Sequence, residues 1–63
     1  MCLTYERVDK IRDELVDVIS WAGYIRLELE KDPDSLAFER ILEIEELLED
    51  LDLDLEEFQQ KFL

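Results

Sequence analysis

Apolar residues recur along the second half of the chain at alternating intervals of three and four positions, as they do on one side of a helix. The series is Ala37, Ile41, Ile44, Leu48, Leu51, Leu55, Phe58 and Phe62. Most positions between them are acidic, and within this stretch only Arg40 and Lys61 are basic. The pattern predicts a long amphipathic helix with an apolar seam and an acidic outer face.

The first half of the chain repeats this spacing. Its apolar series is Val8, Ile11, Leu15, Val18, Ala22, Ile25 and Leu29. We expect a helix from about Tyr5 to Lys31, with Thr4 as its N-terminal cap. Gly23 lies inside this range and costs about 1 kcal/mol relative to alanine. Because the apolar series continues in phase across Gly23, the helix is expected to continue there, with a kink as the alternative.

The segment Lys31-Asp32-Pro33-Asp34-Ser35 separates the two series. Pro33 disfavours helical backbone at Asp32 and is well placed in the first turn of a following helix. Asp32 is therefore the expected cap of the second helix, with Asp34 or Ser35 as alternatives if the turn is longer. So short a connection predicts that the two helices return antiparallel, as an αα-hairpin.

A second interruption is expected in the alternating run from Asp50 to Leu55. Asp54 has the spacing of a capping box with Glu57, so we expect the second helix to end near Asp50. A short third helix would then run from about Leu55 to Phe62. A continuous helix is the alternative, because neither glycine nor proline breaks the apolar series here. A single strand would have no partner to pair with.

The chain has 63 residues, enough for one small helical domain spanning 1–63. So short a chain buries too little surface to be comfortably stable alone. Its single cysteine, Cys2, excludes an internal disulfide, and the absence of histidine removes the common zinc ligand sets. The predicted fold is therefore an all-α antiparallel hairpin that dimerises into a helical bundle. Four residues off the seams are expected to mediate self-association: Trp21, Tyr24, Leu42 and Leu47.

The N-terminal sequence MCLTYERVDK has no hydrophobic core of the kind found in signal peptides. No run of eighteen apolar residues that could span a membrane is present. We therefore expect a cytoplasmic protein without a membrane partner.

The formal net charge of −12 is concentrated in the second half of the chain. Residues 1–33 carry eight acids and five bases, and residues 34–63 carry eleven acids and two bases. This excess excludes direct nucleic-acid binding, which requires basic groups to neutralise phosphates. Residues 39–57 hold ten acids, which in a helix gives one charge per roughly 3 Å, close to the ~3.4 Å of a DNA strand.

The sequence therefore predicts a non-enzymatic acidic binding protein that imitates nucleic acid and inhibits a DNA- or RNA-binding protein through that protein's basic surface. In type it resembles phage-encoded anti-restriction and anti-CRISPR inhibitors. The expected partner-binding face consists of Glu39, Glu43, Glu46, Glu49, Asp50, Asp52, Asp54 and Glu57. The alternative is a small oligomerisation or adaptor module, in which the acids only keep the protein soluble.

One acidic pattern partly matches a metal site. Asp50, Asp52 and Asp54 match the opening of a calcium loop, but its sixth and twelfth positions are Leu55 and Lys61 instead of glycine and glutamate. We therefore expect no dedicated calcium site.

Two further acidic motifs raise an enzymatic hypothesis. The segment 14–17 fits E-x-x-D and the segment 45–49 fits E-E-x-x-E. They resemble the magnesium-binding motifs of the all-α nucleotide pyrophosphatases of the MazG type, in reversed order. The resemblance implies a Mg²⁺-dependent pyrophosphatase, which ranks third. The leading prediction assigns no catalytic residue, no metal and no cofactor.

Overall fold

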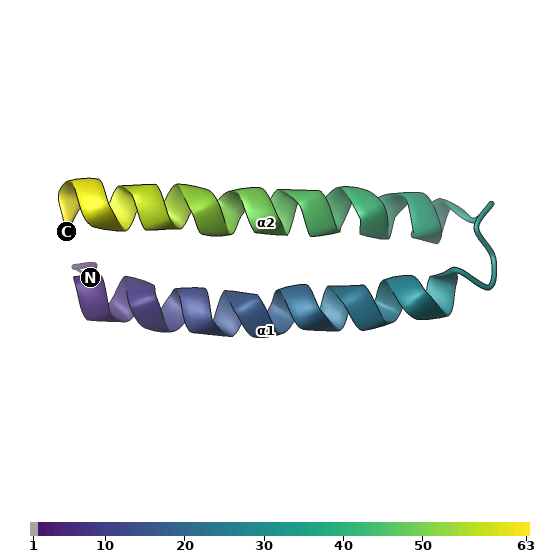
Figure 1. Cartoon of the computed structure of the whole chain (residues 1–63), viewed down its shortest axis with the longest axis horizontal. Coiled ribbons are helices and arrows are strands. Elements are labelled where there is room, and N and C mark those ends of the chain that lie inside the picture. Colours follow the sequence, from purple (N-terminus) through teal and green to yellow (C-terminus); the bar gives the residue numbers. More distant parts are fainter. Residues whose placement is uncertain (1) are drawn as a thin grey trace.

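The computed structural model describes residues 2–63 and consists of two long helices joined by a tight turn (Figure 1). Helix α1 spans Tyr5–Leu29 and helix α2 spans Leu36–Phe62. They lie antiparallel, and both ends of the chain lie at the same end of a rod measuring 43 × 18 × 16 Å. No strand occurs within residues 2–63. The predicted all-α helical hairpin is confirmed.

Both helices begin at hydroxyl caps. The Thr4 hydroxyl oxygen accepts a hydrogen bond from the backbone N–H of Arg7 at 3.2 Å, as expected. In α2 the cap is Ser35, whose hydroxyl oxygen accepts from the N–H of Phe38 at 3.2 Å. The preferred cap Asp32 is wrong, and the alternative Ser35 is correct. The Asp32 carbonyl instead accepts from the Ser35 N–H at 3.1 Å, which closes the turn.

The expected interruption near Asp50 is wrong, and there is no separate third helix in the described chain. Helix α2 continues to Phe62. Neither glycine nor proline opposes it there. The Asp52 carboxylate bonds to Arg12 on α1, 40 residues away in the sequence, so it does not act as a local cap. Asp54 is exposed and also lies within the helix.

Helix α1 likewise continues through Gly23, whose φ is not positive. A Cβ atom placed on Gly23 would meet nothing within 4 Å. Gly23 therefore does not lie against α2.

Only half of the residues in the contact between the helices belong to the predicted apolar series. The shared half is apolar: Val8, Leu15, Ala22 and Ile41 are buried, and Leu29, Leu48 and Leu55 are half-buried. The other half is shifted by one residue toward the C-terminus on both helices. Arg12, Ile19 and Arg26 replace Ile11, Val18 and Ile25, and Glu45, Asp52 and Gln59 replace Ile44, Leu51 and Phe58.

This shift corrects the predicted seam, and it has a physical reason. Arg12 and Arg26 on α1 face acids and an amide on α2, and the resulting cross-helix bonds hold the helices in this rotation. The displaced isoleucines, valine, leucine and phenylalanine remain exposed. The hairpin therefore has a thin core, with four buried apolar residues and the buried amide of Gln59.

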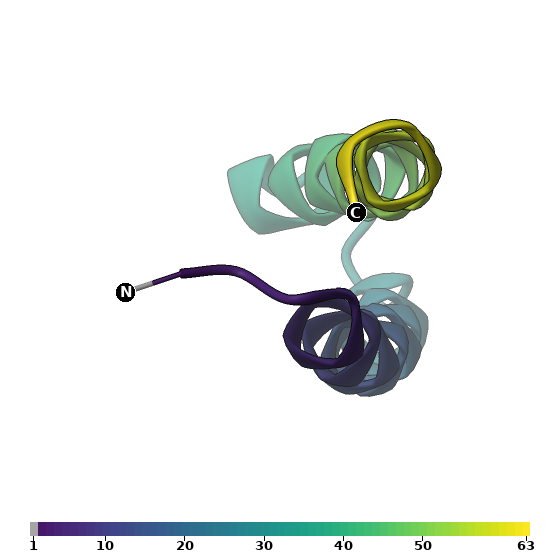
Figure 2. The same ribbon diagram turned by 90° about the vertical axis from the view of Figure 1, so that its left-hand side faces the viewer.

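An end-on view shows that the two helices form a single layer (Figure 2). In the described chain nothing covers the two broad sides of this layer. Each helix therefore keeps two uncovered flanks and an uncovered outer edge, from which a binding surface can be built.

Candidate protein-interaction surfaces

A polar network around Arg12 joins the two helices near the open end of the hairpin. Arg12 Nε donates to Asp52 Oδ1 at 3.1 Å, and another guanidinium nitrogen donates to Gln59 Oε1 at 3.0 Å. The third nitrogen lies 3.6 Å from Glu56 Oε2. The Gln59 amide donates in turn to the backbone carbonyl of Tyr5 at 3.0 Å, so the buried side chain is satisfied at both ends.

The hydrogen bond from Arg12 to Asp52 raises the pKa of the guanidinium, while burial acts in the opposite direction. Arg12 is thus a fixed positive charge that neutralises part of the acidity of α2. The Asp52 carboxylate is bonded within this network, so it stabilises the hairpin and does not belong to an exposed acidic surface.

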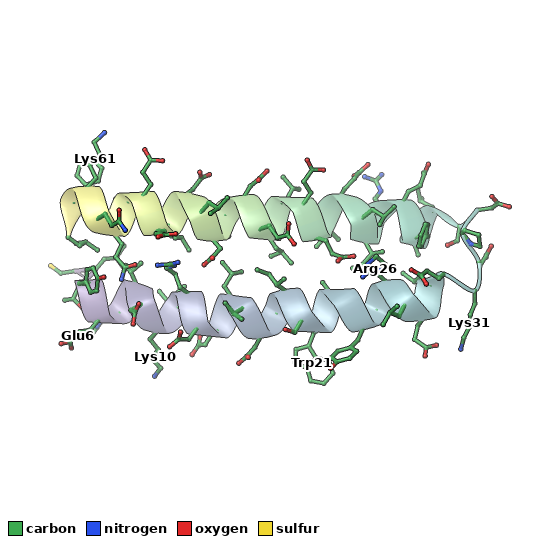
Figure 3. The ribbon with its side chains drawn as sticks, viewed as in Figure 1. Glu6, Lys10, Trp21, Arg26, Lys31 and Lys61 are labelled. Atoms are coloured by element: carbon green, nitrogen blue, oxygen red, sulfur yellow. The ribbon has the colours of Figure 1, made fainter. Side chains whose placement is uncertain are left out.

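A second cross-helix pair lies near the turn. Arg26 points into the space between the helices (Figure 3). Its Nε lies 2.9 Å from Glu45 Oε1, although the N–H is not directed well enough for a hydrogen bond, and a terminal nitrogen donates to Glu30 Oε1 at 3.0 Å. Together with the Arg12 network, this pair places opposite charges across the contact at two levels of the hairpin.

The two broad sides of the hairpin are defined by sequence position. Each displaced apolar residue directly precedes a residue of the contact line, as Ile11 precedes Arg12 and Leu51 precedes Asp52. An antiparallel pair of right-handed helices has an approximate two-fold axis perpendicular to its plane, so equivalent positions on both helices share one side. We name this set the open apolar face: Ile11, Val18, Ile25, Ile44, Leu51 and Phe58.

A rim of eight residues borders the open apolar face, each three or four positions away from one of its residues along the helix. The rim consists of Arg7, Glu14, Trp21, Glu28, Arg40, Leu47, Asp54 and Lys61. It holds three bases and three acids, and the open apolar face holds no charged residue. This broad side of the protein is therefore formally neutral.

The opposite broad side is strongly negative. Seven of its acids directly follow residues of the contact line, Glu6 lies one turn before Asp9 on the same flank, and none of these positions is basic. We name these acids the acidic face: Glu6, Asp9, Asp13, Glu30, Glu39, Glu46, Glu49 and Glu56. Leu27, Leu42 and Leu53 are also exposed on this side, but they stand among the carboxylates. The net charge of −12 is thus segregated by side as well as by helix.

The predicted partner-binding acids are divided among several surfaces. Glu39, Glu46 and Glu49 lie on the acidic face. Glu43, Asp50 and Glu57 lie on the outer edge of α2, farthest from α1, where Glu43 is 3.7 Å from the guanidinium of Arg40. Asp54 belongs to the rim, and Asp52 is bonded between the helices. The structure therefore brings six of the eight together on a continuous exposed surface and removes Asp52 from it.

The predicted self-association residues are also divided. Trp21 and Leu47 lie on the rim of the open apolar face, 67% and 66% exposed. Leu42 lies on the opposite side. Tyr24 lies on the outer edge of α1. Its ring and that of Trp21 are in an edge-to-face arrangement, with their centroids 5.9 Å apart. In Figure 3 the Trp21 side chain points away from α2.

The two acidic motifs with the pyrophosphatase-like pattern do not converge within the hairpin. Glu14 lies on the rim of α1, whereas Glu46 and Glu49 lie on the acidic face of α2, and Glu45 is paired with Arg26. Among residues 2–63 no group of three or more potential ligands is arranged to hold a metal ion. The described part of the chain also contains no pocket.

Two features of the site are absent from the sequence-based predictions. The acids of α1, such as Asp9 and Asp13, join those of α2 on one side, and the open apolar face is left uncovered. The signal for both was present in the sequence. Arg12 and Arg26 recur on α1 at the same helical position that Glu45, Asp52 and Gln59 occupy on α2. Such complementary polar positions identify the contact line and hence both flanks.

Comparison of the chain with protein-family models, curated proteins and solved structures finds no match. Neither described helix has the length and apolar character needed to cross a bilayer.

Proposed function

We propose that this chain is a non-enzymatic binding protein whose acidic face imitates nucleic acid and inhibits a DNA- or RNA-binding protein by occupying that protein's basic cleft. One observation carries the proposal: carboxylates from both helices gather on one side of the rod, where no position is basic and only Glu30 and Glu56 pair with arginines of the contact line. The proposal assigns the chain to the cytoplasm and to the class of phage-type anti-restriction or anti-CRISPR-like inhibitors.

The charge spacing supports this proposal. The acidic face and the adjoining acids Glu43, Asp50 and Glu57 provide eleven carboxylates along a rod 43 Å long. Three of them pair with arginines of the hairpin, which leaves eight, or one per about 5 Å. One DNA strand carries one phosphate per about 3.4 Å of its axis. A basic cleft built for phosphates would be attracted to such a surface, and the encounter would be fast at low ionic strength.

The test is capture of partners on immobilised protein from a bacterial lysate, at low salt and at about 0.5 M salt. We expect the captured proteins to be nucleic-acid-binding proteins that duplex DNA displaces and that high salt releases. The variant E39K/E46K/E49K changes three acids of the acidic face and should lose these proteins.

A matched control changes the formal charge by the same amount elsewhere. D17K/D32K/D34K alters three exposed acids outside the acidic face and should retain the captured proteins. Far-UV circular dichroism of both variants establishes that the helices persist. If the two variants capture the same proteins equally, net charge alone governs binding and the mimicry proposal is overturned.

A second candidate function is an oligomerisation or adaptor module whose acids only solubilise. The exposure of many large apolar side chains, including Trp21 at 67% and Leu47 at 66%, favours it. Under this function, charge changes on the acidic face leave binding intact and apolar substitutions abolish it. Both candidates have the chain act as a homodimer, which is likewise a proposal.

A further inference from the structure

The open apolar face carries six large apolar side chains and no charged residue. Its six residues expose between 37% and 50% of their surface, although each belongs to an uninterrupted apolar series along its helix. The hairpin covers one half of each series, and on the contact line Ile19 and five polar residues, including Arg12 and Arg26, take the place of the other half. A helix whose two apolar lines are both regular is suited to contact two neighbours, and here each helix has only one.

We propose that a second copy of this chain docks on the open apolar face, giving a four-helix bundle with the acidic faces of both copies outward. This inference does not depend on nucleic-acid mimicry. It assigns the interface to Ile11, Val18, Ile25, Ile44, Leu51 and Phe58, with Trp21 and Leu47 at its rim.

Charge distribution selects this side over the other. A second copy also carries −12, so two acidic faces repel each other. The rim holds three bases and three acids, so two neutral sides can meet without that penalty. The arrangement also directs both acidic faces to solvent, where they remain available to a basic partner.

The whole broad side, with the open apolar face, its rim and the ends of the helices together, has about the size that a stable dimer needs. The broad side of the rod measures 43 by 18 Å, or about 770 Å² in outline. A standard protein interface buries about 800 Å² on each partner. A lone 63-residue hairpin with four buried apolar residues has little core of its own, and a second layer supplies the missing burial.

The regular spacing of the face favours an identical partner. Its residues repeat every seven positions on both helices, about 10.5 Å apart along each axis. A second copy turned about a two-fold axis presents side chains and gaps at the same interval, so the two faces can interlock along their full length.

A matched pair of substitutions tests the assignment. Leu51 and Leu42 are both on α2 and are 46% and 45% exposed, but Leu51 belongs to the open apolar face and Leu42 to the acidic side. L51D should weaken self-association by at least about 100-fold, because each copy would bury a charge in the interface. L42D should leave it unchanged. The measurement is sedimentation velocity across a range of concentrations, with the wild type expected at twice the 7.6 kDa chain mass.

The single tryptophan gives an independent readout. Trp21 lies at the rim, so its emission should shift to shorter wavelength as the wild type and L42D associate, and remain unshifted in L51D. A wild type that is monomeric at about 100 μM overturns the proposal, as does dissociation of L42D but not L51D. An assembly larger than a dimer overturns it as well. If L51D unfolds, the wild-type Tm is measured at several protein concentrations instead. The Tm of a dimer rises with concentration, and a constant Tm contradicts the proposal.

The two proposals fail independently. E39K/E46K/E49K is expected to remain dimeric while losing its captured partners. A dimeric wild type without nucleic-acid-binding partners removes mimicry alone, and a monomeric wild type that still captures them removes the dimer alone.

Discussion

The side chain of Arg12 crosses the helix pair to Asp52, with 3.1 Å between Arg12 Nε and Asp52 Oδ1. This contact joins residues 40 positions apart and is continued by Gln59 to the backbone of Tyr5. It fixes which side of each helix faces the other. The exposed face made by Ile11 and Leu51 is a direct result of that choice.

Removing one partner of the Arg12–Asp52 pair is expected to destabilise the fold more than replacing both partners by apolar residues. R12M leaves Asp52 and Gln59 without their donor and should lower Tm, and D52L leaves the guanidinium without its carboxylate and should do the same. The double variant R12M/D52L should recover part of the loss, because two apolar side chains can pack where the ions met. Thermal unfolding of the four proteins measures the coupling. Strictly additive losses would contradict a direct interaction.

The raised pKa of Arg12 predicts the pH dependence of its contribution. A group whose pKa is higher in the folded state favours folding at every pH below its unfolded value and loses this effect only as pH rises through the folded value. Both values lie far above neutrality. The difference in Tm between wild type and R12M should therefore stay constant from about pH 7 to about pH 10. A difference that shrinks toward pH 10 would show that another group carries the effect.

Gly23 is expected to be a site of easy stabilisation. It lies within α1, its φ is not positive, and an added Cβ meets nothing within 4 Å. G23A should therefore raise the free energy of unfolding by about 1 kcal/mol, through the higher helix propensity of alanine. For a domain of this size that corresponds to a rise in Tm of about 4–8 °C. The reverse change at the neighbouring buried position, A22G, should lower Tm, and a fall with G23A would contradict the open surroundings of Gly23.

Two adjacent residues should differ sharply in their contribution to stability. Leu15 is 9% exposed on the contact line, and Val16 is 52% exposed on the acidic side. L15A should lower the free energy of unfolding by about 2–3 kcal/mol, through lost burial and the cavity left behind. V16A should change it by less than about 0.5 kcal/mol. Chemical denaturation of both variants measures these values, and similar effects would mean that α1 is rotated relative to α2.

Much of this architecture could be predicted from the sequence. The spacing of Val8, Leu15 and Ala22 and of Ile41 and Leu48 identifies two helices, and Pro33 with its neighbours identifies the turn. These signals are local, because they depend on residues within one or two helical turns. Even the cap at Ser35 was among the alternatives.

The rotation of the helices could not be predicted from apolar spacing alone. Val8 can form a contact line with Ile11 or with Arg12, since both lie beside it on the helix. The choice depends on a residue of the other helix, Asp52, which is far away in the sequence. The same long-range bond holds Asp52 against α1 and so favours a continuous helix through the run near Asp50, where the expected cap Asp54 lies exposed within the helix. Local rules do not contain this information.

The balanced rim around the open apolar face has a consequence for how ionic strength acts on the protein. Mobile ions weaken attraction between exposed charges of opposite sign and leave the burial of apolar surface almost untouched. Under the two proposals, salt should therefore release a basic partner from the acidic face while the dimer persists. A titration with sodium chloride would thus distinguish partner binding by the acidic face from self-association through the open apolar face.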